Sequence, residues 1–128
     1  MPDRAHYAAM LRFVSGKLDE TEAADPRTAA MVAVLREAAT AFEAGQPLTV
    51  AGNRLDLAAR AFAGFAAFLQ KQILPEAVAH GNSAGEAQIR RAVDFAMEAV
   101  SLLLSRSALG TGEDVILPTS QAASSVVD

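Results

Sequence analysis

The chain has 128 residues, of which 52% are hydrophobic, and it carries a net charge of −4 with no cysteine. This length suits a single domain. The lack of cysteine excludes a disulfide framework, a thiolate zinc site and a cysteine nucleophile, and two histidines leave little for a histidine-rich metal site. Aromatic residues make up only 5% while alanine is abundant, so the composition favours helices over sheets.

The charge distribution argues against nucleic-acid and membrane partners. Between positions 27 and 106 the chain carries eight basic and seven acidic residues, which leaves no basic stripe for displacing counterions from a nucleic acid. No run reaches the roughly 18 apolar residues of a spanning helix, and the first residues lack the apolar run of a signal peptide. We therefore expect a cytoplasmic protein with no nucleic-acid and no membrane partner. The excess of arginine over lysine, with so much alanine, is typical of a GC-rich bacterial genome.

The first two predicted helices carry apolar residues at helical spacing. The first runs from Asp3 to between Ser15 and Leu18. The second begins at Asp25, because aspartate is a favoured N-cap and the following proline suits the first helical position, and it ends at Gly45. The apolar face of the first helix comprises Tyr7, Met10, Leu11, Val14 and Leu18, and that of the second comprises Met31, Val34, Leu35, Ala38 and Phe42.

The third predicted helix runs from residues 49–53 to Ile73 and is apolar around more than half of its circumference. A helix of this kind is normally central or contacted from two directions. Pro75 has no backbone N–H and its ring clashes with the preceding turn, so we expect a kink or break there. One further turn follows and ends at Gly81.

The fourth predicted helix begins at Ser83 and ends near Ser107. Ser83 and Glu86 have the spacing of a capping box, in which each side chain satisfies a free backbone N–H of the other residue. Its predicted core stripe comprises Ile89, Ala92, Val93, Ala96, Met97, Val100, Leu103 and Leu104.

Together these segments predict an all-α, antiparallel four-helix bundle with a kinked third helix and an irregular C-terminal tail. Residues 1–107 form the predicted bundle domain and residues 108–128 the tail. The tail contains one apolar triplet, Val115, Ile116 and Leu117. We expect this triplet to dock in an apolar groove of the same or a neighbouring protomer.

Three patterns in the sequence point to chemistry, and each lacks the context that its chemistry needs. Residues 81–85 match the letters of a serine nucleophile elbow, but no strand is predicted before the serine. Glu76 and His80 offer two metal ligands, whereas a bundle metal site needs further carboxylates on other helices. His6 and Met97 are possible haem ligands, but His6 lies about 100° away from the apolar face of its helix. We therefore expect no catalytic residue, no metal site and no cofactor.

A second apolar stripe is the feature that favours a partner. Phe95 and Leu102 lie seven residues apart, on the side of the fourth helix opposite Ile89 and Val93. Matching extra stripes on two helices indicate a partner surface, so we expect a homodimer or a complex with a partner helix. The predicted partner-binding residues are Leu57, Ala61, Phe68, Phe95 and Leu102.

Three function hypotheses follow from the sequence, and the first of them is the leading one. The first is a non-enzymatic interaction protein of the adaptor, chaperone or regulatory type, in which Phe95 and Leu102 are exposed. The second is a sensor of a small molecule or cofactor, with an apolar pocket and one or two inward polar groups. The third is an enzyme, which requires converging titratable residues. The pocket of the sensor would be lined by Phe62, Phe65, Met31 or Met97.

Overall fold

The structure is a computed structural model that describes residues 4–22 and 25–117, with side chains described at 4–20 and 25–117. Four helical segments dominate it, and the predicted all-α four-helix fold is confirmed. The helices are α1 (Arg4–Glu22), α2 (Pro26–Ala44), α3 (Leu55–Phe68), which continues into η2 (Leu69–Ile73) and α4 (Leu74–Ala79), and α5 (Ser83–Leu109). The shorter elements are β1 (Leu48–Val50), the 3-10 turn η1 (Gly52–Arg54) and β2 (Val115–Leu117).

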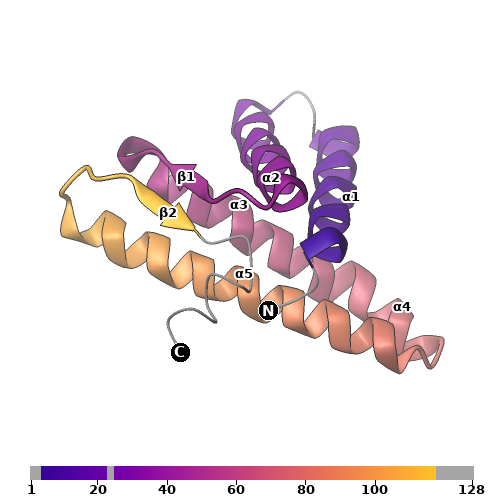
Figure 1. The fold of residues 1–128 in the computed structure, drawn as a ribbon. Coiled ribbons are helices and arrows are strands. Elements are labelled where there is room, and N and C mark those ends of the chain that lie inside the picture. The colour runs from indigo at the N-terminus through magenta and orange to yellow at the C-terminus, as the bar shows by residue number, and fades with distance from the viewer. Residues whose placement is uncertain (1–3, 23–24, 118–128) are drawn as a thin grey trace, which may run out of the picture.

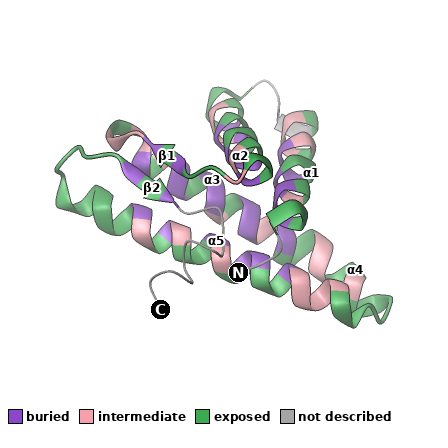
Figure 2. Ribbon diagram, viewed as in Figure 1, coloured by how far each residue is buried: buried purple, intermediate pink, exposed green. Residues whose placement is uncertain are grey.

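The helices are arranged as two antiparallel pairs. Figure 1 shows α1 and α2 side by side as a hairpin that lies across the longer pair formed by α3 and α5. Figure 2 shows the buried residues on the faces that the two pairs turn toward each other. One core therefore lies between the hairpin and the long pair, and all four helices contribute to it.

Both ends of α2 are set by local signals in the sequence. The Asp25 side chain accepts a hydrogen bond from the backbone N–H of Arg27 at 3.0 Å, and Pro26 occupies the first helical position. Gly45 ends the helix with a φ of 68°, a left-handed conformation that glycine adopts without steric cost. Both predicted boundaries of this helix are confirmed.

The third helical segment bends before Pro75, as predicted. Residues 69–73 form a π-helical turn, in which the backbone N–H of Leu74 donates to the carbonyl of Leu69. Proline cannot donate a backbone hydrogen bond, and its ring crowds the carbonyl four residues earlier. The wider π turn accommodates this defect. The helix therefore bends there, and α3, η2 and α4 follow one another without an intervening loop.

A two-stranded antiparallel ribbon, absent from the sequence-based expectation, lies beside the helices. β1 pairs with β2 in the register Leu48↔Leu117, Thr49↔Ile116 and Val50↔Val115. Val115 and Leu117 are buried while Ile116 is exposed, as the alternation of side chains along a strand requires. The apolar triplet of the predicted tail thus lies against the same protomer, and residues 118–128 of that tail lie outside the described residues.

The start of α5 differs from the prediction by one residue. The N-cap is Asn82, whose side-chain oxygen accepts a hydrogen bond from the backbone N–H of Gly85 at 3.0 Å. Ser83 is the first residue of the helix and is not its cap, so the predicted capping box is wrong. Asparagine and serine are equally good N-caps, and the left-handed turn at Gly81 places the asparagine at the cap position.

This cap can be tested by a matched pair of substitutions. We expect Asn82→Ala to lower the free energy of unfolding by about 1 kcal/mol, because it leaves backbone N–H groups of α5 without their acceptor. Ser83→Ala serves as the control and should change it by less than about 0.5 kcal/mol, since alanine is a good helix former. Urea denaturation of both variants measures the difference. A larger loss for Ser83→Ala would restore the serine as the cap.

The ribbon also generates a prediction, because the segment that leads into β2 passes very close to Gly52. A Cβ atom at Gly52 would lie 1.9 Å from the backbone oxygen of Gly112, and the N–H of Gly52 donates to the Asp114 carboxylate at 2.9 Å. Gly52→Ala should therefore lower the free energy of unfolding by about 2 kcal/mol.

Gly64→Ala is the control, because nothing lies within 4 Å of a Cβ there and the residue is inside a helix. It should raise stability by about 0.5–1 kcal/mol. Equal thermal unfolding of the two variants would contradict the close approach of Gly112.

Candidate functional site

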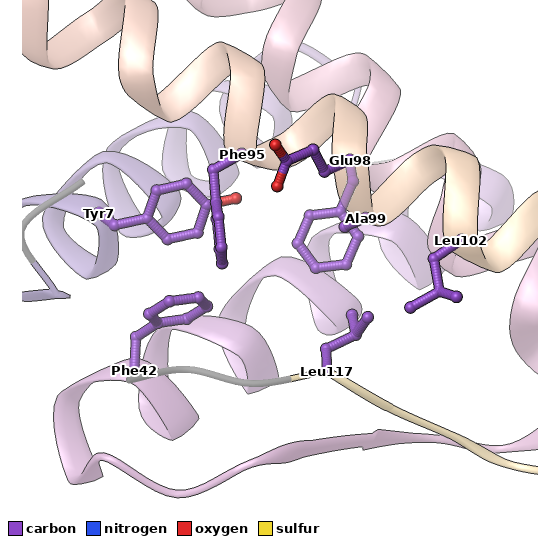
Figure 3. A pocket seen from close by; sticks show the side chains of 8 residues that line it. Tyr7, Phe42, Phe95, Glu98, Ala99, Leu102 and Leu117 are labelled. Carbon is purple, nitrogen blue, oxygen red and sulfur yellow. The ribbon is translucent and has the colours of Figure 1, made fainter. Parts of the chain in front are cut away.

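An apolar pocket opens between the α1–α2 hairpin, the α3–α5 pair and the β ribbon (Figure 3). Its volume of about 160 Å³ is close to the roughly 150 Å³ of an apolar cavity that accepts one benzene molecule. We call this hollow the Tyr7 pocket. The described residues that line it are Tyr7, Phe42, Phe62, Phe95, Glu98, Ala99, Leu102 and Leu117.

Each wall of the pocket follows from the position of its residue on an element. Phe42 lies in the last turn of α2, three residues before the Gly45 stop. Phe95 and Leu102 lie seven residues apart on α5, so they share one face of that helix. Leu117 is the inward residue at the end of β2 and closes the pocket from the ribbon side.

Tyr7 is the centre of an aromatic cluster at one wall of this pocket. Its ring centroid lies 4.6 Å from that of Phe42, 5.4 Å from that of Phe65 and 5.2 Å from that of Phe95. Two of these contacts are edge-to-face, which is a favoured geometry for aromatic rings. The rings of Phe42 and Phe95 also contact each other, with their centroids 5.7 Å apart. This wall of the pocket is therefore formed by rings that pack against one another.

The Tyr7 hydroxyl is the unusual atom of the site. Tyr7 is 0% exposed, and its hydroxyl oxygen has no hydrogen-bond partner among the described residues. Burial raises the pKa of this hydroxyl well above its usual value, so it stays protonated at neutral pH. In Figure 3 it points past the Phe95 ring into the pocket. An unpaired buried hydroxyl costs about 1–3 kcal/mol, so a polar atom that reached it through the pocket would gain a hydrogen bond.

Glu98 supplies the charge at the rim of the Tyr7 pocket. It is exposed, and it is the only charged side chain among the described residues that line the pocket. The structure records no ion pair for its carboxylate within the described part of the chain. The pocket therefore combines apolar walls, one buried neutral hydroxyl and one carboxylate that faces solvent.

The structure places the predicted α5 stripes differently from the sequence analysis. Phe95 and Leu102, predicted to be on a partner surface, are half-buried and line the Tyr7 pocket. Met97 and Leu104, predicted to be in the core, are 46% and 47% exposed. The prediction for Met97 and Leu104 is therefore wrong. The face of α5 that turns inward is rotated toward Phe95, because α1, α2 and β2 contact the helix on that side.

The other predicted partner-binding residues differ in their surroundings. Ala61 is buried inside the protomer, so it is not available to a partner. Leu57 is half-buried and lies in a separate hollow together with Met31 and Arg60. Phe68 is half-buried, and its ring centroid lies 6.4 Å from that of the exposed Phe13 ring.

The lining expected for a sensor is found only in part. Phe62 lines the Tyr7 pocket, whereas Phe65 contacts the Tyr7 ring and is not among the lining residues. Met31 and Met97 lie elsewhere. Helical periodicity did not identify Tyr7 and Glu98 as pocket residues. The signal that identifies Tyr7 is its place as the single tyrosine on an otherwise aliphatic face.

The patterns weighed for metal binding and catalysis remain apart from this pocket. The His80 ring lies with Nδ1 2.8 Å from the backbone oxygen of Glu76, at the exposed end of α4. Ser83 is exposed, and helix rather than a strand precedes it. Among the side chains described at 4–20 and 25–117, no three histidine or acidic residues come together in a way that would hold a metal ion. None of the described helices combines the length and apolarity needed to cross a membrane.

The buried hydroxyl generates a prediction about pH. The unfolded chain releases the tyrosine proton near pH of about 10, whereas the folded protein retains it. Below that pH the Tyr7 hydroxyl is protonated in both states, and its contribution to the free energy of unfolding is fully present. As the pH rises further, this contribution falls by up to about 1.4 kcal/mol per pH unit.

Tyr7→Phe removes both the proton and the unpaired oxygen. We expect its free energy of unfolding to equal or exceed that of the wild type at neutral pH, by up to about 1 kcal/mol. Above pH of about 10 the variant should lose less stability than the wild type. Urea denaturation over this pH range tests the difference, and all other titrating groups are common to both proteins. Parallel pH profiles would show that the hydroxyl is not buried.

Comparison with known proteins identifies no relative of this chain. No protein family, curated protein sequence or solved structure matches the chain. The case for a function therefore rests on the Tyr7 pocket itself.

Proposed function

We propose that this protein is a cytoplasmic sensor that binds one small apolar molecule in the Tyr7 pocket. The observation that carries the proposal is the buried Tyr7 hydroxyl, which lacks a partner among the described residues and points into an apolar hollow. An apolar pocket with few convergent polar groups is the usual form of a small-molecule site. The proposal corresponds to the second of the hypotheses raised by the sequence.

The size of the pocket limits the molecule. Pockets for drug-sized ligands usually measure about 300–1,000 Å³, whereas this one measures about 160 Å³. One ring or a short branched chain fills such a space. The walls from Phe62, Leu102 and Leu117 supply the apolar contact surface for it.

The chemistry of the pocket favours binding over catalysis. At neutral pH the Tyr7 hydroxyl is a neutral donor or acceptor, because burial raises its pKa. Glu98 is exposed at the rim and forms no described pair with another titratable group. General acid–base catalysis needs a group whose pKa lies near the working pH. The pocket offers shape, apolar surface and one hydrogen bond, which are elements of recognition.

A second candidate function comes from the exposed residues of α5. Met97 and Leu104 lie seven residues apart on one face of the helix and are both about half exposed. This pair supports a non-enzymatic interaction protein that forms a homodimer or binds a partner helix through α5. It ranks second because two exposed side chains of this kind are common on monomeric proteins.

The proposal predicts that ring-sized probes bind the pocket. Benzyl alcohol and toluene share one ring, but only the alcohol can form a hydrogen bond with Tyr7. In titrations followed by NMR, we expect both to bind the wild type. Tyr7→Phe should weaken the binding of benzyl alcohol about five- to tenfold, which corresponds to the loss of one hydrogen bond. It should leave the affinity for toluene unchanged.

Two further variants show whether binding occurs in the pocket. Ala99→Leu places extra side-chain volume in the hollow and should abolish binding of both probes, because Ala99 lines the wall. Ser105→Leu adds the same side chain on the exposed face of α5 and is the control. If neither probe binds the wild type, the sensor proposal is refuted and the interaction protein takes its place.

A further inference from the structure

We propose that the Tyr7 pocket takes a small organic cation, an amine that carries one ring or a short branched apolar group, with its charge beside Glu98. This inference rests on the proposed function and names the ligand class of the same site. The ring or branched group lies between Phe62 and Leu102, and the charged end faces the rim.

The sign of the charge comes from Glu98. Its carboxylate is at the edge of the pocket, on the side of the Phe95 ring (Figure 3). The positions three and four residues away on the same helix face are Asp94, Phe95, Ser101 and Leu102, so no basic side chain on α5 neighbours the carboxylate. None of the described lining residues is basic. An anion placed here would face this carboxylate without a compensating charge, whereas a cation completes an ion pair.

The aromatic walls favour the same class of ligand. The faces of phenylalanine and tyrosine rings attract an ammonium group held within about 6 Å. Phe42, Phe62 and Phe95 all contribute rings to the pocket. A cation that leaves water to enter the pocket therefore meets ring faces on its apolar side and the carboxylate at the rim.

Tyr7 completes the arrangement. Its hydroxyl stays protonated because burial raises its pKa, so it does not place a second negative charge in the hollow. Glu98 therefore remains the one charged side chain among the described residues that line the pocket.

The test compares three probes of one ring each, which differ in charge. Benzylamine is a cation at neutral pH, benzyl alcohol is neutral and benzoate is an anion. In calorimetric titrations at low salt, we expect benzylamine to bind the wild type about fivefold more tightly than benzyl alcohol, as for an exposed ion pair. Benzoate should bind the most weakly. The advantage of benzylamine should shrink at about 0.5 M salt, because exposed charges are then screened.

Glu98→Gln should remove the advantage of benzylamine and leave benzyl alcohol unchanged. Glu76→Gln removes the same charge from the exposed end of α4 and is the matched control. Both residues are exposed, so both variants are expected to fold, and their melting temperatures check this.

The outcomes separate the two proposals. If benzyl alcohol and benzylamine bind equally to the wild type and to Glu98→Gln, the cation inference is overturned while binding in the pocket stands. If none of the three probes binds the wild type, the proposed function falls with it. Tighter binding of benzoate than of benzylamine would reverse the inferred sign of the charge.

Discussion

The aromatic contacts of Tyr7 join α1, α2, α3 and α5 at one place. One ring from each of these helices takes part, through Phe42, Phe65 and Phe95 in addition to Tyr7 itself. The hairpin lies across the long pair, so helix faces alone leave a gap at the crossing that large side chains must fill. The rings pack at this crossing, and the pocket lies beside them. The same packing that stabilises the fold therefore also creates the site.

The parts of the fold that were predicted correctly are those with a local cause. Asp25 and Gly45 act within one turn of α2, and Pro75 acts on the turn that precedes it, so the sequence carries the full signal. The ribbon was missed because its strands have three residues each, too few for a period of two to be recognised. Its pairing joins β1 to a segment beyond the last helix, and nothing local marks such a contact.

The site was predicted less well, for a geometrical reason. Helical periodicity identifies that Phe95 and Met97 lie on different faces of α5, but it cannot say which face meets the hairpin. In the structure α5 packs against α3, and its Phe95 also contacts Tyr7 and Phe42 of the hairpin, so the inward arc of α5 includes Phe95 and Leu102. Met97 is then left on the outside. The missing information is the crossing of the two helical pairs, which depends on contacts between distant segments.

The lining of the Tyr7 pocket has a consequence for how this protein assembles. Its residues extend from Tyr7 to Leu117, almost from the first described residue to the last. Bringing such distant residues together means closing long loops, and the chain entropy lost in doing so is offset only when the whole core forms. The pocket therefore exists in the complete native state and in no isolated helical hairpin. Any molecule that binds there contacts side chains from α1, α2, α3 and α5. It therefore stabilises the whole fold against unfolding, by an amount that grows with its concentration relative to its Kd.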